Sequence, residues 1–370
     1  MREHVAEYLT SGPSFGEGEV IDRIEAFRRR RPRLRDTVVT LAHGAGGKAS
    51  AALVDAVFLE AFRNPQLESL GDGAVIAMPG GPRLAMSTDS FVVQPLRFPG
   101  GSIGDLAVNG TVNDLAMAGA VPSWMTAAFV LEEGFAIEEL RGIVADMAAA
   151  ARAAGVQIVT GDTKVVPRGA ADGMFITTAG AGVVPSERDL SPRKVRPGDR
   201  VLASGTIGDH GMAVMLARGD LAIEADIHSD TAAVTGLVER LLRAAPKTRW
   251  LRDPTRGGVG TVCNELAQAC GLAVVLEEDR LPVRSDVAGA CEMLGIDPLY
   301  VANEGKFLAV VDPAEADDAL DALRSHPAGG DAAEIGRIAD EPAATVLVRT
   351  AFGGTRIVDM LVGDPLPRIC

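Results

Sequence analysis

The chain has 370 residues, and its 50 acidic against 36 basic side chains give a formal net charge of −14. Such an acidic balance disfavours nonspecific binding to nucleic acid or to anionic membranes. Apolar residues make up 47% of the chain, but no apolar run approaches the roughly 20 residues of a membrane-spanning helix. The length is sufficient for two domains, each with its own core.

The beginning of the chain and its cysteines predict the cellular compartment. Residues 1–4 read Met-Arg-Glu-His and begin no apolar signal core, so export is not expected. The cysteines show no CxxC spacing, which argues against a zinc site and a disulfide framework. They are Cys263, Cys270, Cys291 and Cys370. We therefore predict a cytoplasmic protein in which Cys263 and Cys270 pack in a helix core.

A glycine-rich loop follows the first segment of the chain. Residues 1–36 form an extension whose arginine cluster fits either a partner-docking segment or a solvated leader. A short strand is predicted at 38–41, and the sequence His43-Gly-Ala-Gly-Gly-Lys48 then leads into an amphipathic helix. Glycines let backbone N–H groups face an anion, and Lys48 adds a positive charge, so this loop is a candidate phosphate site. The Walker pattern is absent, which makes the signal weak by itself.

Three aspartates come from three separate elements of the next segment. Asp72 precedes a strand at 74–78, and Asp89 lies near the end of its hairpin partner at 83–90. Asp114 follows Asn113 in a helix predicted within 101–120, whose other residues are mostly small or apolar. Polar side chains in an apolar helix are costly unless something pairs with them. A structural hydrogen-bond network could pair them, but three converging carboxylates favour a metal ion that bridges phosphates.

The first domain is predicted to continue to residue 184. A strand at 124–131 and a helix at 137–154 precede a strand at 157–159, which runs into Thr160-Gly-Asp-Thr-Lys164. Polar residues at the carboxyl end of a strand are where α/β sheets usually contact ligands. Lys164 is either a salt-bridge partner of Asp162 or a catalytic residue. After a strand at 174–182, residues 185–198 form the predicted linker, because they carry three prolines and mixed charges.

The second domain, predicted at 199–350, places polar residues at glycine-rich turns. Gly208-Asp-His-Gly211 and Asp253-Pro-Thr-Arg-Gly-Gly258 each put an aspartate and glycines before a helix. Asn303-Glu-Gly305 is predicted to form a polar kink between two strands, where Glu304 is either a turn residue or a base. Residues 351–370 form a predicted flexible tail, so Cys370 is either a frayed end or a mobile nucleophile.

These motifs, in this order, together with the terminal Pro367-Arg-Ile-Cys370, resemble the HypE family of hydrogenase maturation factors, which are carbamoyl dehydratases. The ATP motifs alone resemble a wider superfamily that includes aminoimidazole ribonucleotide synthetase, selenophosphate synthetase and thiamine-monophosphate kinase, whereas the terminus is specific to HypE. The resemblance covers about residue 37 to the end. Gly73 departs from it, because relatives often carry a second acidic residue or alanine there, and this leaves the metal count open.

The resemblance implies a two-domain α/β fold like that of aminoimidazole ribonucleotide synthetase. The N-terminal domains would pair into a shared β-barrel in a homodimer, beside a mixed α/β C-terminal domain, with ATP in the cleft between the domains. The residues implied to hold Mg²⁺ are Asp72, Asp89, Asp114 and Asp253. Further residues implied at the nucleotide are Lys48, Asn113, Asp209 and the turn Gly161-Asp162-Thr163, which the other subunit would supply in one arrangement.

The implied reaction begins when a carbamoyltransferase, HypF, loads a carbamoyl group on Cys370, and it ends when a HypC–HypD scaffold takes the cyanide for the iron of a nickel–iron hydrogenase. Converting a thiocarbamoyl group to a thiocyanate removes an oxygen, which ATP can turn into departing phosphate. Two N–H protons must also leave, and this requires a base. The candidates are Glu304 and Lys164, with His210 as an assisting or positioning group. Two alternatives remain: a small-molecule kinase or synthetase of the same superfamily, and a non-catalytic nucleotide-binding scaffold.

Overall fold

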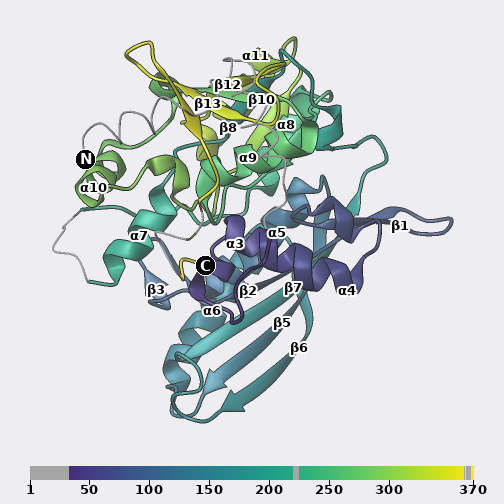
Figure 1. Cartoon of the computed structure of the whole chain (residues 1–370). Coiled ribbons are helices and arrows are strands. Elements are labelled where there is room, and N and C mark those ends of the chain that lie inside the picture. The colour runs from purple at the N-terminus through teal and green to yellow at the C-terminus, as the bar shows by residue number, and fades with distance from the viewer. Residues whose placement is uncertain (1–32, 220–224, 362, 364–367) are drawn as a thin grey trace, which may run out of the picture.

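The structure is a computed structural model that describes residues 33–219, 225–361, 363 and 368–370. Two sheets with helices packed against them account for most of the chain (Figure 1). Most of the predicted N-terminal extension lies outside the described residues. In the part of the chain that is described, no helix is both long enough and apolar enough to cross a membrane.

The first domain is built on a five-stranded sheet with the order β1-β2-β7-β5-β6. Its strands are β1 (Ala74–Ala77), β2 (Arg83–Phe91), β5 (Val121–Glu132), β6 (Gln157–Val166) and β7 (Met174–Val184). Helices α5 (Ile103–Met117) and α6 (Ile137–Ala154) pack against each other beside this sheet. The sheet is open within the chain, so a single chain forms no closed barrel, and β6 is left as an edge strand.

Helix α5 is the central element of the first domain. Ser102 caps its N-terminus by accepting a hydrogen bond from the Gly104 N–H at 3.2 Å, and the Asp105 carboxylate accepts from the Ser102 N–H at 2.9 Å. This reciprocal pair is a capping box, which satisfies N–H groups that the first helical turn leaves unpaired. A Cβ at Gly104 would collide with the Ile143 carbonyl of α6, so only glycine permits this close approach. Thirteen of the fifteen residues of α5 are buried.

The second domain contains a seven-stranded mixed sheet with the order β14-β13-β10-β12-β8-β11-β9. The strands are β8 (Arg200–Ala203), β9 (Trp250–Arg252), β10 (Ala273–Glu277), β11 (Leu308–Val311), β12 (Ala333–Ala339), β13 (Val346–Arg349) and β14 (Thr355–Val358). The helices are α7 (Asp209–Ala217), α8 (Thr235–Ala244), α9 (Gly258–Cys270), α10 (Ser285–Leu294) and α11 (Ala316–Arg324).

Alternating side chains bury both faces of this second sheet. Val201 and Ala203 of β8 join a core with α9, whereas Leu202 between them joins a separate core with α8 and α11. This follows from the period of two along a strand. A third core spans both domains, because it contains residues of α5, α6, α7 and α10. The two domains therefore share packed surface, and residues of both can be held at fixed distances.

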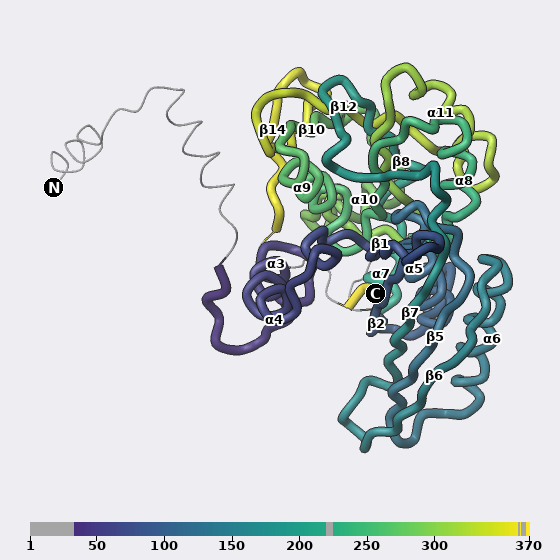
Figure 2. The backbone as a smooth tube through the Cα atoms, turned by 90° about the vertical axis from the view of Figure 1, so that its right-hand side faces the viewer, coloured from purple at the N-terminus to yellow at the C-terminus, as the bar shows by residue number. Residues whose placement is uncertain are grey.

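The remaining α-helices and strands are short. They are α3 (Lys48–Leu53), α4 (Glu60–Phe62) and the short pair β3 (Arg97–Phe98) and β4 (Gly101–Ser102). Figure 2 shows α3 and α4 standing off from the two sheets, with the C-terminus near β2. Strand β14 lies inside the segment predicted to be a flexible tail, so ordered structure continues through Val358.

Three predicted local structures differ from the observed ones. Residues 38–41 form no strand; instead Leu41–Gly44 is a 3₁₀ turn, whose His43 accepts a hydrogen bond from the Thr40 N–H at 3.0 Å. The predicted turn at Gly161–Thr163 lies inside β6, because the parallel pairing with β5 continues to Val166. Asn303-Glu-Gly305 follows a 3₁₀ turn rather than a strand and leads to β11. At Gly161–Thr163 the pairing of β6 with β5 outweighs the local preference of glycine for a turn.

Candidate functional site

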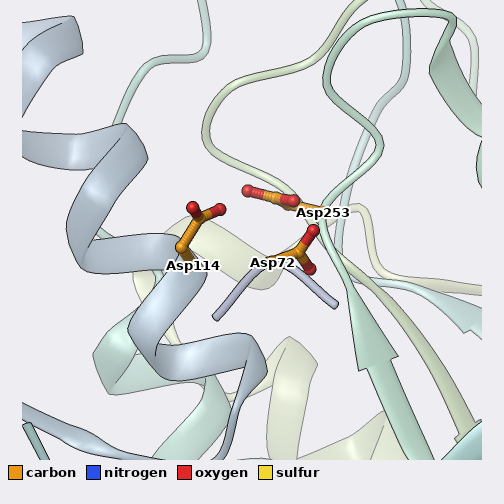
Figure 3. A group of neighbouring side chains, drawn as sticks. All are labelled: Asp72, Asp114 and Asp253. Carbon is orange, nitrogen blue, oxygen red and sulfur yellow. The ribbon is translucent and has the colours of Figure 1, made fainter. Parts of the chain in front are cut away.

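Three aspartates converge where the two domains meet. Asp72 lies just before β1, Asp114 projects from α5, and Asp253 directly follows β9 (Figure 3). Carboxylate oxygens of the three residues lie within 4.8 Å of one another. Oxygen ligands brought together from separate rigid elements are what Mg²⁺ requires in proteins. The arrangement matches three of the four predicted metal ligands.

The electrostatics of this triad fit a divalent cation. Burial, aided by the neighbouring carboxylates of Asp89, Asp253 and Asp72, raises the pKa of Asp114 well above its usual range. Burial also raises the pKa of Asp72 and of Asp253, and Asp89 adds repulsion to both. Because like charges this close oppose ionisation, a bound cation would stabilise the charged form of all three carboxylates. The residues present therefore fit a magnesium ion.

Asp89 is set slightly apart from the triad. It is absent from the group whose oxygens lie within 4.8 Å, and Thr111 donates a long hydrogen bond of 3.4 Å to its carboxylate. It is still close enough to raise the pKa of all three triad carboxylates. Asp89 therefore contributes negative charge to the site from one end of β2.

Arg252 is a charged neighbour of the triad that the sequence did not indicate. Its Nε lies 2.7 Å from Oδ1 of Asp72, and its Nη2 lies 3.1 Å from Oε2 of Glu265. Ser87, also not predicted, donates a hydrogen bond to the Asp114 carboxylate. These contacts hold Asp72 and Asp114 in place. The only sequence signal for Arg252 is its position next to Asp253.

Glu304 is a buried carboxylate with features of a general base. It is 2% exposed. Its N–H donates to Asp230 Oδ1 at 3.2 Å, whereas in the described part of the chain its carboxylate receives no hydrogen bond. Burial, together with the charges of Asp253, Asp230 and Asp89, raises the pKa of Glu304 well above its usual range. A carboxylate of high proton affinity that is not already paired is suited to accept a proton from substrate.

Asn113, which is predicted to contact the nucleotide, bonds to the backbone of the second domain in this structure. Its Nδ2 donates to the carbonyls of Ala232 and Glu304, each at 2.9 Å, and its Oδ1 accepts from the Val234 N–H at 2.8 Å. The side chain is wholly buried. Every polar group of the amide is therefore engaged by backbone of the second domain, so Asn113 joins the domains and fixes the backbone of Glu304.

The glycine loop contacts the C-terminal segment. The Lys48 N–H donates to the Leu361 carbonyl at 2.9 Å, and Lys48 Nζ lies 2.8 Å from Asp359 Oδ2. A Cβ at Gly47 would collide with the Leu361 carbonyl, which explains the glycine at that position. The predicted phosphate contact of Lys48 therefore requires that its ammonium group exchange Asp359 for a phosphate.

The residues Gly161 to Lys164 do not join the triad within one chain. They lie on the edge strand β6, where Lys164 Nζ is 2.7 Å from Asp162 Oδ2 and both side chains are mostly exposed. Gly161 is required there because a Cβ would collide with the Ala127 carbonyl of β5. The salt-bridge alternative for Lys164 is thus observed in the single chain. A role of Gly161, Asp162, Thr163 and Lys164 at a nucleotide remains a prediction that needs a second chain.

Asp209 and His210 occupy the start of α7 and are both buried. Thr206 donates to the Asp209 carboxylate, whose Oδ1 is buried without a hydrogen-bond partner among the described residues. His210 lies 2.8 Å from Ser229 Oγ through Nδ1 and 3.0 Å from the Ile369 carbonyl through Nε2. The structure thus brings His210 to the chain end and leaves Asp209 a polar atom that a ligand could engage.

Residues 368–370 pack against the body of the protein, where Ile369 is buried and Arg368 and Cys370 are half-buried, although the sequence predicted a flexible tail. The Val92 N–H donates to the Cys370 carbonyl at 3.1 Å, and the Gln94 N–H donates to the Arg368 carbonyl at 3.3 Å. Ile369 is 2% exposed and belongs to the core shared by both domains. Backbone hydrogen bonds thus pair residues 368–370 with the segment that follows β2. The preceding residues 364–367 lie outside the described part of the chain.

The other thiols are shielded to different degrees: Cys263 and Cys291 are buried, and Cys270 is half-buried. Burial raises the pKa of Cys263 to about 12 and of Cys291 to about 11, and it also raises the pKa of Cys270. No disulfide bond joins any of the four cysteines in the described part of the chain. The thiolate is the reactive form of cysteine. Cys263, Cys270 and Cys291 are therefore poor nucleophiles near neutral pH, as the sequence predicted when it placed Cys263 and Cys270 in a helix core.

The two-domain arrangement, with carboxylates gathered between the domains, defines a protein related to AIR synthase. Residues 70–184 match the family of the AIR synthase related protein N-terminal domain, and residues 196–349 match that of its C-terminal domain. Carbamoyl dehydratase HypE of Rhodobacter capsulatus is 55% identical over 91% of this chain and 99% of its own. The chain belongs to the HypE family of carbamoyl dehydratases.

Solved structures of this family have the same fold. A structure described as a HypE–HypF complex has a TM-score of 0.80 and 48% identity, and covers 84% of this chain and 100% of that one. A structure of hydrogenase maturation protein HypE in complex with ATP has a TM-score of 0.75 and 46% identity, with coverage of 90% and 100%. The predicted family and the predicted fold are therefore both confirmed.

Proposed function

We propose that this protein uses ATP to dehydrate a carbamoyl group on Cys370 to a thiocyanate, and so supplies cyanide for the iron of a nickel–iron hydrogenase. One observation carries the proposal: Ile369 is buried and Cys370 is half-buried, and backbone hydrogen bonds of Arg368 and Cys370 hold this end of the chain beside the segment that follows the Asp89-bearing strand. A chain end with no role in catalysis would normally lie at the surface. Burial raises the pKa of the remaining three thiols and so disfavours their reactive thiolate form, which leaves Cys370 as the acceptor.

The chemistry requires activation of the carbamoyl oxygen. That oxygen attacks the γ-phosphorus of ATP, an N–H proton leaves, and a C=N bond forms while ADP departs. Loss of the second N–H proton then expels phosphate and gives S–C≡N, so the carbamoyl oxygen leaves with the phosphate. Glu304 is the proton acceptor that we place in this reaction, because its carboxylate is buried and has a raised proton affinity. His210 has a positioning role.

A magnesium ion fits the site beside this base. Asp72, Asp114 and Asp253 would hold it, with Asp89 as an additional acidic residue nearby. Such an ion neutralises phosphate charge and aligns the phosphoryl group when bound. Lys48 is placed to contact a phosphate of the nucleotide once it separates from Asp359, and Asp209 is a further nucleotide contact. ATP itself is supported by the solved structure of a HypE bound to ATP.

A homodimer would complete the site. Strand β6 is an unpaired edge with nine of its ten residues exposed, and unpaired edges are surfaces on which another strand pairs. Exposed apolar side chains lie on this strand and on its neighbour β5, namely Trp124, Ile158, Val159 and Val165. Pairing of the N-terminal domains into a shared barrel would bury them. It would also give Gly161, Asp162, Thr163 and Lys164 a route to the partner's nucleotide.

The partners follow from the same reaction. HypF is the expected carbamoyl donor, which the structure described as a HypE–HypF complex supports. A HypC–HypD complex is the expected acceptor of cyanide. We place these encounters in the cytoplasm. We retain 37–184 and 199–350 as the two domains and treat residues 1–36 as an extension without a catalytic role.

Mass spectrometry of the chain end tests this function. After incubation with carbamoyl phosphate, ATP, Mg²⁺ and HypF, the C-terminal peptide should carry a carbamoyl group that loses one water to become a cyano group. A C370A variant should carry neither. ATP consumption with a free small molecule and no adduct would instead indicate a kinase of the same superfamily, and nucleotide binding without any turnover would indicate a scaffold.

A further inference from the structure

The backbone carbonyl of Ile369, the residue directly before Cys370, is held by a side chain. Its neighbours, the carbonyls of Arg368 and Cys370, accept from backbone N–H groups of Gln94 and Val92. The Ile369 carbonyl accepts instead from His210 Nε2 at 3.0 Å. Arg218 Nη2 also donates to the Arg368 carbonyl at 2.9 Å. We call the four residues that hold 368–370 the tail seat, namely Val92, Gln94, His210 and Arg218.

The proton positions on His210 follow from its two partners. A carbonyl oxygen only accepts, so Nε2 must carry the hydrogen that it donates to Ile369. In the neutral ring Nδ1 is then an acceptor, and the Ser229 hydroxyl must donate to it across the 2.8 Å contact. The Ser229 oxygen in turn accepts from the Thr231 N–H at 3.1 Å. The direction of every hydrogen bond in this chain of groups is thereby fixed.

Ser229 is itself rigidly placed. Its N–H donates to the Pro99 carbonyl at 2.8 Å, and a Cβ at Gly100 would lie 2.6 Å from the Ser229 carbonyl oxygen. The ring of His210 also meets the edge of Phe98, with the ring centroids 5.5 Å apart. The imidazole is therefore held by Ser229 and Phe98 as well as by the chain end.

The same short segment also holds the proposed base. Asp230, the residue after Ser229, accepts a hydrogen bond from the Glu304 N–H at 3.2 Å. Residues 229–230 thus connect to the Ile369 carbonyl through His210 and to the backbone of Glu304 directly. A displacement of this segment would move the tail relative to the base.

We propose that Ser229 is a positioning residue, whose hydroxyl donates to His210 Nδ1 and orients the ring so that Nε2–H holds the peptide carbonyl next to Cys370 in register with Glu304. The proposal rests on the proposed function for its catalytic consequence, but the docking of the tail can be measured without it. In S229A the ring loses this donor to Nδ1. H210A removes the donor to Ile369 altogether, whereas H210Q retains an amide N–H that can reach the same carbonyl.

Alkylation of Cys370 by iodoacetamide measures how often the tail leaves its seat. Loss of a hydrogen bond of ordinary strength shifts such an equilibrium by roughly two- to tenfold. We expect S229A and H210A to increase the alkylation rate of Cys370 by this factor, and H210Q to lie closer to wild type. The matched controls are S186A and H326A, whose side chains lie outside the tail seat. Alkylation of buried Cys263 reports any loss of folding.

Dehydration of carbamoylated Cys370 supplies the second readout. S229A should lower kcat with little change in the KM for ATP, since ATP contacts are untouched. An unchanged Cys370 alkylation rate and an unchanged kcat in S229A would overturn the proposal. If S229A exposes Cys263, long-range proton–nitrogen correlation spectra of the wild-type protein decide instead. An Nδ1–H tautomer of His210 would overturn the proposal. An Nε2–H tautomer that is lost on deletion of residues 369–370 would support the proposal. Failure of any carbamoyl adduct to form would refute the proposed function and leave the alkylation result standing.

Discussion

Lys48 and Asp359 are 311 residues apart in sequence, yet Lys48 Nζ lies 2.8 Å from Asp359 Oδ2. The pair joins the glycine loop to the segment after β14, and the Lys48 N–H bonds the Leu361 carbonyl beside it. Lys48 is also the cation predicted to meet a phosphate. Binding of nucleotide at this loop and retention of the segment at 359–361 are therefore competing uses of one ammonium group.

This competition predicts the behaviour of an Asp359→Asn variant. Both side chains are partly exposed, with exposed fractions of 36% for Lys48 and 47% for Asp359, and such pairs contribute about 0–1 kcal/mol. D359N should thus bind ATP equally well or up to about fivefold more tightly, whereas K48A should bind it more weakly. Isothermal titration calorimetry checks both. A loss of affinity in D359N equal to that in K48A would contradict the competition.

The acidic triad predicts opposite effects of Asp114→Asn with and without metal. The amide removes a buried charge repelled by Asp72, Asp89 and Asp253, so above neutral pH the metal-free variant should be more stable by about 1 kcal/mol, or about 2–4 °C in Tm. It should lose the further gain in Tm that Mg²⁺ and ATP give to wild type. D89N should weaken Mg²⁺–ATP binding similarly and abolish ATP turnover.

Differential scanning fluorimetry with and without Mg²⁺–ATP measures both parts of this prediction. The exposed Asp331 provides the matched control, because D331N should change neither value. A D114N protein that keeps the full Mg²⁺–ATP stabilisation would remove Asp114 from the metal site.

Glu304→Gln should separate nucleotide binding from dehydration. The amide keeps the shape and loses the basicity, so ATP affinity should stay nearly normal while the rate of thiocyanate formation falls by about a hundredfold or more. Single-turnover mass spectrometry gives this rate, and the exposed Glu133→Gln is the control. Formation of thiocyanate at the wild-type rate in E304Q would assign the base to another residue, and Lys164→Ala would be the next variant to measure.

Protonation of His210 should make the fold sensitive to acid. Burial lowers the pKa of His210 from its ordinary value of 6.5, against the opposing charge of Asp230 and the hydrogen bond to Ile369. Below about pH 6.5 the unfolded chain binds a proton that the folded chain excludes, so stability falls with pH by up to about 1.4 kcal/mol per unit until the folded pKa is reached.

The variant H210Q lacks this titration. Denaturant unfolding at several pH values should therefore show wild type losing stability relative to H210Q as the pH falls below 6.5, with a constant difference above it. A stability difference that is independent of pH, or that changes in favour of wild type on acidification, would mean that the buried ring is already charged.

The sequence predicted the elements that local pattern determines. Helix α5 was visible because its small and apolar residues enclose Asp114, and the β1–β2 hairpin was visible from two apolar runs around a Pro-Gly turn. Asp72 and Asp114 were found in the same way, whereas the family resemblance added Asp253 as a metal ligand. The family resemblance supplied what pattern could not, including the shared barrel, for which a single chain shows only an open sheet and its unpaired edge.

The relationships that the sequence missed are tertiary. Arg252 faces Asp72 across the domain boundary, and Ser229 and Asp230 belong to no motif, because their roles depend on partners far along the chain. Gly161 resembled a turn residue, yet its small size allows β6 to pack closely against Ala127 of β5. The glycine- and proline-rich tail indicated flexibility, and the sequence pattern could not show that Ile369 is buried.

The most direct test of the account follows the carbamoyl oxygen in one turnover. Protein carbamoylated at Cys370, with a heavy oxygen isotope in the carbamoyl group, is mixed with ATP and Mg²⁺ and then analysed for inorganic phosphate and the C-terminal peptide. The account predicts that the isotope appears in the phosphate while Cys370 becomes a thiocyanate. Release of the isotope as water, or a cyano group on Cys263, Cys270 or Cys291 with none on Cys370, would contradict it.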